Sequence, residues 1–169
     1  DYGVAERMKA SGELPLRVTH NDTKLHNVMI DLETGRGICV VDLDTVMPGL
    51  AMNDFGDSIR FGASTAAEDE QDLSKVSCSM ELYEAFAKGF IEGCGGRLMD
   101  IEIDLMPRGA QVMTYECGMR FLTDYLQGDV YFKTHRAGQN LDRCRTQFKL
   151  VQDMENKWDT MYEIIQKYK

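Results

Sequence analysis

A polar segment followed by two short apolar strands constrains the fold of this chain more than any other part of its sequence. His20, Asp22 and Asn27 stand in the arrangement H-x-D-x-x-x-x-N. Residues 28–32 and 37–41 are rich in apolar and β-branched side chains, and a polar turn that contains glycine separates them. This pattern predicts a β-hairpin with a polar loop before its first strand and an acidic residue after its second.

The expected register of the hairpin brings its two polar ends together. A turn centred between Thr34 and Gly35 pairs Asn27 with Asp42, which directly follows the second strand. Directly opposed side chains project from the same face of an antiparallel pair, with Cβ atoms roughly 5 Å apart. Carboxylate and amide oxygens are ligands that a hard cation prefers. The sequence therefore predicts a Mg²⁺ site at Asn27 and Asp42, with Asp22 just outside it.

This combination of residues indicates phosphoryl transfer. Kinases place a catalytic aspartate and a metal-binding asparagine at the D and N positions of this motif, and a second metal-binding aspartate follows in the chain. Because His, Asp and Asn are also ordinary loop residues, a coincidental turn-rich hairpin is the alternative interpretation. We expect His20 to pack and hydrogen-bond within the loop rather than to take part in the chemistry.

Beyond the hairpin the hydrophobic period changes from two to three or four, which predicts helices. The acidic segment 63–79 should form a solvent-facing connection between them. The apolar stripe of the last helix most simply packs in the core, with a coiled-coil dimer as the alternative. The expected helices begin near Asp54, cover the apolar stripe from Met80 to Ile91, run from near Pro107 to about Gln127, and run from an Asn140 cap to the C-terminus.

Composition favours one domain that binds neither nucleic acid nor membranes. The net charge of −9 over 169 residues argues against nucleic acid and anionic lipid as partners. No apolar run approaches the length needed to span a membrane. The five cysteines are scattered and form no C-x-x-C pair, so the sequence predicts neither a disulfide framework nor a zinc site, and it favours a reducing, cytoplasmic location.

Four segments of the chain resemble a known family: residues 15–24, 53–61, 120–132 and 140–143. They resemble the C-terminal lobe of the aminoglycoside phosphotransferase and choline kinase group, which shares the protein-kinase fold. The sequences LTDYL and GDVYF within the third segment are similar, more narrowly, to bacterial N-acetylhexosamine 1-kinases. The resemblance implies an α+β, mainly α fold in which a catalytic β-hairpin joins a helical bundle.

The resemblance also implies the chemistry and its cofactors, ATP and Mg²⁺. By position, Asp22 would be the catalytic base that takes the proton from the anomeric hydroxyl of N-acetylglucosamine or N-acetylgalactosamine as this hydroxyl attacks the γ-phosphorus of ATP. Asn27 and Asp42 would hold Mg²⁺. Lys24 would offset the charge that builds on the transferring phosphoryl group, and a solvated surface lysine is the alternative.

Phe61, Arg120 and Tyr131 match positions that contact the sugar in the hexosamine kinases. Aromatic faces pack on the C–H surfaces of a pyranose, and a guanidinium donates to hydroxyls. Asp54 resembles a buried aspartate at a helix start that accepts backbone N–H groups of the catalytic loop. A choline or aminoglycoside kinase would instead need an acidic pocket, and a non-catalytic kinase-like binding module is the third alternative.

The resemblance further implies that residues 1–169 form only one of two lobes. Neither a Gly-rich phosphate loop nor a strand lysine paired with a helix glutamate precedes His20. In the family an N-terminal lobe that clamps the nucleotide occupies this position. We expect that missing lobe to be the partner of this chain, and we expect residues 1–169 alone to be inactive.

Overall fold

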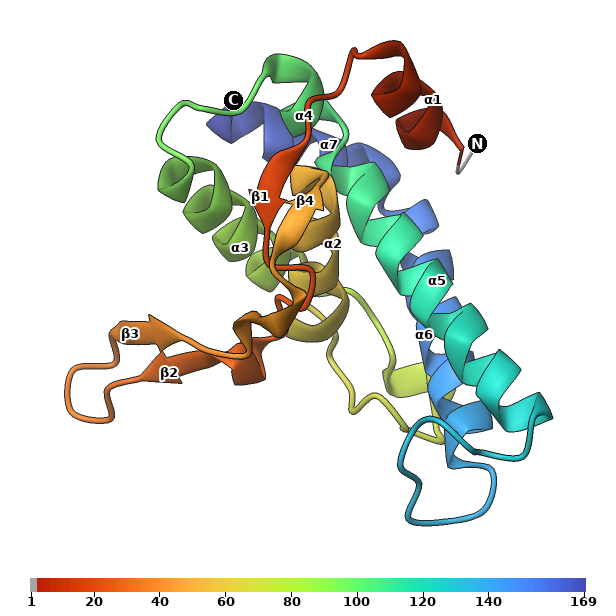
Figure 1. The fold of residues 1–169 in the computed structure, drawn as a ribbon. Helices are drawn as coiled ribbons and strands as arrows, with labels where there is room; N and C mark the ends of the chain where they lie inside the picture. The colour runs from red at the N-terminus through yellow and green to blue at the C-terminus, as the bar shows by residue number, and fades with distance from the viewer. Residues whose placement is uncertain (1–2) are drawn as a thin grey trace.

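The computed structural model describes residues 3–169, which form mostly helices around a central apolar core (Figure 1). This architecture is the expected α+β, mainly α fold. Two pairs of short strands lie in the first third of the chain, and the helices follow. The strands are β1 (Arg17–Thr19), β2 (Val28–Ile30), β3 (Gly37–Val40) and β4 (Met47–Gly49), and the helices are α1 (Val4–Ser11), α2 (Ala51–Gly62), α3 (Met80–Gly93), α4 (Asp100–Asp104), α5 (Met106–Leu126), α6 (Gln139–Asn156) and α7 (Trp158–Tyr168).

The strands form two separate antiparallel pairs, β1 with β4 and β2 with β3. The β1–β4 pair lies beside α2, and the β2–β3 hairpin projects away from the helices (Figure 1). The two loops that join these pairs, residues 20–27 and 41–46, therefore leave the β1–β4 pair at the same end. The 3₁₀ turns Leu25–Asn27 and Leu43–Thr45 lie in these loops.

The expected hairpin forms, but the expected register is wrong by one residue. Val28 pairs with Val40, and the N–H of Val41 donates to the carbonyl of Asn27 at 2.9 Å. Asn27 therefore faces Val41 and not Asp42, so the two proposed metal ligands are not a directly opposed pair.

A side chain that caps the turn explains the shifted register. The carboxylate of Asp31 accepts hydrogen bonds from the backbone N–H groups of Glu33 and Thr34 and from the hydroxyl of Thr34. Gly35 closes the turn with a φ of 67°, in the left-handed region that favours glycine. This turn is centred earlier in the chain than the sequence pattern suggested, and a bulge in the ladder beside Ile30 follows from it.

The expectation of one long C-terminal helix is wrong. Lys157, at φ −107° and ψ 13°, breaks it into α6 and α7. Helix α6 packs along α5, and α7 packs against α3. The apolar stripe is therefore buried within one chain, and its residues are not free to form a coiled-coil dimer. The cap is Gly138 instead of Asn140, which is fully buried in the first turn of α6.

The segment between α2 and α3 is also less exposed than its acidic composition predicts. Val76 and Cys78 are buried in the main core. The backbone N–H of Cys78 donates to the carboxylate of Asp153 at 2.7 Å, which ties this segment to α6. Leu82, expected on the apolar stripe of α3, is instead exposed.

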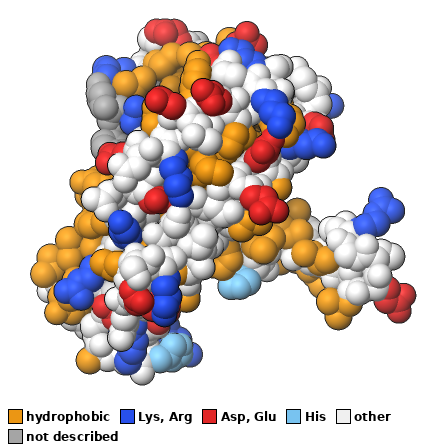
Figure 2. All heavy atoms as spheres, turned by 180° about the vertical axis from the view of Figure 1, so that it is seen from behind, with side chains coloured by type: hydrophobic (Ala, Val, Ile, Leu, Met, Phe, Trp, Pro, Cys, Tyr) orange, Lys and Arg blue, Asp and Glu red, His pale blue; other side chains and the backbone are white. Residues whose placement is uncertain are grey.

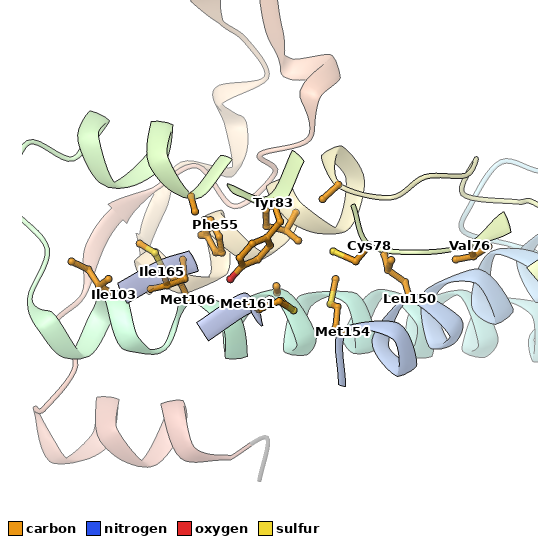
Figure 3. Packing of buried hydrophobic residues seen from close by; sticks show 14 residues of the cluster. Phe55, Val76, Cys78, Tyr83, Ile103, Met106, Leu150, Met154, Met161 and Ile165 are labelled. Atoms are coloured by element: carbon orange, nitrogen blue, oxygen red, sulfur yellow. The ribbon is translucent and has the colours of Figure 1, made fainter. Parts of the chain in front are cut away.

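The core lies where α2, α3, α5, α6 and α7 meet. Figure 3 shows Phe55, Tyr83, Met106, Met161 and Ile165 converging from α2, α3, α5 and α7, and all five side chains are fully buried. Burial of side chains of this size contributes about 1.5–3 kcal/mol each. These residues hold α2 and α5 together beneath the loop 20–27.

Two glycines let α2 and α5 approach closely. A Cβ atom at Gly56 would lie 2.3 Å from the carbonyl oxygen of Gly109, and one at Gly109 would lie 2.1 Å from that of Met52. Any larger residue at either position would push the helices apart. This close crossing fixes the N-terminal half of α2 against the first turn of α5.

The β2–β3 hairpin exposes apolar side chains on both of its faces. Leu32 is 98% exposed and Ile38 is 64% exposed. Figure 2 shows hydrophobic side chains along this projecting hairpin. Separately, none of the helices within residues 3–169 has the length and apolar character needed to cross a membrane.

Candidate active site

Hydrogen bonds to α2 hold the loop of residues 20–27 in place. The carboxylate of Asp54 accepts hydrogen bonds from the backbone N–H groups of His20 and Asn21, both at 2.8 Å. The hydroxyl of Thr23 donates to the carbonyl of Asp54 at 2.5 Å. Burial raises the pKa of Asp54, while the two hydrogen bonds from the loop oppose that rise. Asp54 thus fixes the conformation of the loop by accepting hydrogen bonds from two of its backbone N–H groups.

The ring of His20 joins the loop to the end of β3. Its Nε2 lies 3.0 Å from the carbonyl oxygen of Val41, so Nε2 carries the proton and donates. The hydroxyl of Thr45 donates to the carbonyl of His20 at 2.6 Å. The ring and the carbonyl of His20 thus link the loop of residues 20–27 to the segment 41–45.

Asp22 receives two donors on a single oxygen. Lys24 Nζ donates to Asp22 Oδ2 at 2.6 Å, and Asn27 Nδ2 donates to the same oxygen at 2.9 Å. The other oxygen, Oδ1, has no hydrogen-bond partner within residues 3–169. Burial alone would raise the pKa of Asp22, but the hydrogen bonds from Lys24 and Asn27 outweigh it and hold the pKa below its ordinary value. Asp22 is therefore ionised at neutral pH, with one oxygen free to accept a proton.

Asn27 and Asp42 come near the same point by a route other than cross-strand pairing. Asn27 is buried, and its N–H₂ group donates to Asp22, which leaves Oδ1 as the atom that could bind a cation. Asp42, two residues past the end of β3, takes a left-handed conformation with φ 64° and ψ 55°. This turn brings Asp42 Oδ2 to 4.0 Å from Lys24 Nζ. Lys24 consequently lies between the two carboxylates.

The donor set at this point fits a hard cation. Asn27 Oδ1 and the carboxylate of Asp42 are oxygen donors, which Mg²⁺ prefers. Among the described residues no group of three or more His, Cys, Asp or Glu side chains could hold a metal ion by itself. A Mg²⁺ ion here would therefore depend on oxygens from a bound nucleotide, as such sites commonly do.

A cavity of about 610 Å³ opens beside Asp22 and Lys24. Phe61 from α2, Arg120 from α5 and Tyr131 from the loop after α5 line its far side. The structure thus brings these three residues together with the two loop residues. The volume lies within the range of small-molecule sites, about 300–1,000 Å³.

The aromatic side of the cavity is built around Arg120. Its guanidinium carbon lies 5.5 Å from the ring centre of Phe132 and 5.9 Å from that of Tyr131. Phe61 packs edge-on against the ring of His26, with centroids 4.8 Å apart. Tyr131 is 73% exposed and so presents most of its ring to a ligand.

The cavity is basic although the chain as a whole is acidic. Two carboxylates line it, those of Asp22 and Glu68. Five cationic side chains also line it: Lys24, Arg60, Arg120, Lys133 and Arg143. Several of these cations are neutralised within the cavity, since Arg60 and Arg143 both pair with Glu68. Arg120 and Lys133 have no carboxylate partner within residues 3–169. This charge distribution is opposite to the acidic pocket that a cationic substrate needs.

Asp124, near the end of α5, fixes the loop that carries Tyr131. Its carboxylate accepts hydrogen bonds from the backbone N–H groups of Val130, Tyr131 and Phe132, at 2.8–3.0 Å. Asn140 of α6 adds a fourth donor at 2.9 Å. Burial alone would raise the pKa of Asp124, but the three backbone hydrogen bonds keep it below its ordinary value.

The sequence interpretation missed several residues of this site. Glu68, Lys133 and Arg143 carry no local motif, and their proximity depends on how the helices pack. Asp124 has a recognisable signal, because an acidic residue at a helix end precedes a Gly-Asp turn at 128–129.

The sequence profile of the phosphotransferase enzyme family matches residues 3–90 of this chain. The matched region is more than half of the 169 residues. It contains the loop 20–27, the hairpin and α2, and so includes Asp22, Asn27, Asp42 and Asp54. It ends before α5, and therefore does not include Arg120 or Tyr131.

Proposed function

Because this chain belongs to the phosphotransferase enzyme family, we propose that it is the C-terminal lobe of a kinase that uses ATP and Mg²⁺ to phosphorylate the anomeric hydroxyl of an N-acetylhexosamine. One observation carries this proposal. The ionised Asp22, with one unpartnered oxygen, borders the same cavity as Phe61, Arg120 and Tyr131. A sugar held by these three residues would meet the catalytic base directly.

In the proposed reaction Asp22 Oδ1 accepts a hydrogen bond from the anomeric hydroxyl of the sugar. The anomeric oxygen forms a bond to the γ-phosphorus, and the bond from this phosphorus to the β,γ-bridging oxygen breaks, leaving its electron pair on ADP. The proton of the hydroxyl passes to Asp22. Because the pKa of Asp22 lies below its ordinary value, Asp22 is present as the carboxylate, the form that can accept this proton.

Lys24 and the metal would balance negative charge. The hydrogen bond to Asp22 raises the pKa of Lys24, so Lys24 remains a cation beside the transferring group. Mg²⁺ bound by Asn27 and Asp42 would neutralise charge on the β- and γ-phosphate oxygens of ATP.

The chemistry of the cavity supports a neutral sugar over choline or an aminoglycoside. Two aromatic rings, Phe61 and Tyr131, offer faces for pyranose C–H groups, and Arg120 offers donors for hydroxyls. The unpaired Arg120 and Lys133 would repel a cation. The same two cations favour a second candidate function, a kinase of this family for a hydroxylated acceptor that carries a negative charge.

We also propose that a nucleotide-clamping N-terminal lobe covers the β2–β3 hairpin. Exposed apolar side chains on both faces of a two-stranded hairpin mark a surface that another part of the protein covers. Residues 1–169 alone should therefore bind ATP weakly and turn over negligibly. Robust ATP-dependent phosphorylation by the purified 169-residue chain would contradict this proposal.

A coupled assay of ADP release by the full-length gene product tests the proposed function. The acceptors are N-acetylglucosamine, N-acetylgalactosamine, choline, an aminoglycoside and glycerate, each with Mg-ATP, and Asp22→Asn is the control variant. We expect ADP release only with an N-acetylhexosamine, and we expect the rate of this release to fall at least 100-fold in the Asp22→Asn variant. Release with choline or the aminoglycoside would refute the charge argument, and release with glycerate alone would select the second candidate.

A further inference from the structure

Asp57 has a buried carboxylate oxygen that no group of the described chain satisfies. The residue lies on α2, facing α5, and is only 6% exposed. Its Oδ1 accepts a hydrogen bond from Nε of Arg60 at 3.0 Å, and the charged Nη2 of Arg60 lies 2.9 Å from the same oxygen. Its Oδ2 is buried and has no hydrogen-bond partner within residues 3–169.

A buried carboxylate oxygen of this kind needs a hydrogen-bond donor from outside the chain. A buried carboxylate oxygen without a donor is strongly disfavoured, because the lost hydration is not replaced. Folded proteins nearly always satisfy such a group with the protein itself, with water or with a ligand. Arg60 does not supply the second donor, since its Nε donates to Oδ1 and its Nη1 donates to Glu68.

A small recess adjoins this side chain. It has a volume of about 90 Å³, enough for a few water molecules or one substituent of a sugar, but not for a whole sugar. It lies between the catalytic loop, α2 and α5. Its lining residues are Asn21, Asp22, Asp57, Arg60, Met113, Glu116, Cys117 and Arg120.

The recess adjoins the large cavity. Five lining residues are common to both: Asn21, Asp22, Arg60, Cys117 and Arg120. A ligand in the large cavity can therefore extend a substituent into the recess while its reacting hydroxyl stays beside Asp22.

We propose that Asp57 Oδ2 accepts a hydrogen bond from a hydroxyl or amide N–H group of the acceptor sugar, other than the hydroxyl that is phosphorylated. This inference rests on the proposed function and extends it to a residue that selects the acceptor. The donor is a neutral group, because Arg60 and Arg120 already supply positive charge around the recess. Asp57 thereby orients the sugar against Asp22 and disfavours acceptors that lack this donor.

Kinetic measurements that combine the Asp57→Asn variant with analogues of the substrate test the role of Asp57. The substrates are N-acetylglucosamine, its 3-, 4- and 6-deoxy analogues, and 2-deoxyglucose, which lacks the acetamido group. The enzyme is the full-length gene product as wild type and as Asp57→Asn, and kcat/KM is measured for each pair. Asp159→Asn, the same chemical change on the exposed surface of α7, is the matched control.

We expect one analogue to lose about 10- to 100-fold in kcat/KM with the wild type. The Asp57→Asn variant should lose a similar factor with N-acetylglucosamine, but no further factor with that analogue. The Asp159→Asn control should follow the wild type. If Asp57→Asn fails to fold, as judged by thermal melting, Asp57→Ser takes its place in the same measurements.

Two failures are distinguishable. If the wild type is active and every analogue loses the same factor with both enzymes, the role of Asp57 is refuted while the proposed function stands. If the wild type phosphorylates no sugar, the proposed function fails and the inference fails with it.

Discussion

Replacing Gly56 with alanine tests how the crossing of α2 and α5 holds the site. The added Cβ would lie 2.3 Å from the carbonyl oxygen of Gly109, about 1 Å closer than van der Waals contact allows. Because the obstructing atom belongs to the backbone, it cannot rotate away, and the helices must separate. Overpacking of this kind costs about 3 kcal/mol, and the better helix propensity of alanine returns about 1 kcal/mol.

The expected net loss of stability is therefore about 2 kcal/mol for Gly56→Ala. At 2–4 °C per kcal/mol for a chain of this size, Tm should fall by about 4–8 °C. Since α2 carries Phe61 and α5 carries Arg120, kcat/KM should fall as well. Circular dichroism melting of the 169-residue chain measures the first effect, and the ADP-release assay of the full-length protein measures the second.

Gly89→Ala is the matched control for this prediction. Gly89 is also helical, in α3, and nothing lies within 4 Å of its added Cβ. This variant should gain about 0.5–1 kcal/mol in stability, because alanine loses less backbone entropy on folding. If Gly56→Ala proves as stable as Gly89→Ala, the close crossing does not constrain the two helices and the argument is refuted.

Three further predictions concern the cavity and its supports. Asp54→Ala removes the acceptor for two backbone N–H groups of the catalytic loop. Steady-state kinetics should therefore show a kcat at least 10-fold lower, with a smaller change in the KM for ATP. An unchanged kcat would argue against a role of Asp54 in positioning the loop. Asp124→Asn loosens the loop that carries Tyr131, so the KM for the sugar should rise severalfold with little change in kcat, whereas a fall in kcat alone would contradict it. Lys24→Met removes a hydrogen bond that lowers the pKa of Asp22, so this pKa rises and the acidic limb of the profile of kcat/KM against pH should move to higher pH. A limb that stays in place would show that Asp22 does not set it.

The sequence was sufficient to predict the elements of the site that lie close together in the chain. The hairpin, the loop before it and α2 follow from hydrophobic period and turn residues. The register of the hairpin did not, because the side chain of Asp31 caps the turn and moves its centre. The break at Lys157 likewise has no local signal, since neither glycine nor proline stands there, and it depends on the packing of α7 against α3.

Residues that converge from distant segments were only partly predictable. Phe61, Arg120 and Tyr131 were identified through a family resemblance, because nothing in their spacing links them. Asp57 was missed, since its significance lies in burial and in an unpaired oxygen, which are properties of the packed structure. A buried carboxylate beside a recess is visible only after the helices are in place.

The most direct test of the central claim is ³¹P NMR of the reaction of the full-length gene product with Mg-ATP and N-acetylglucosamine. The account predicts a sugar phosphate signal whose phosphorus couples to the anomeric proton, and the absence of this signal in the Asp22→Asn variant. A phosphate on any other hydroxyl, or an undiminished signal from the variant, would contradict the proposed reaction and the role of Asp22 in it.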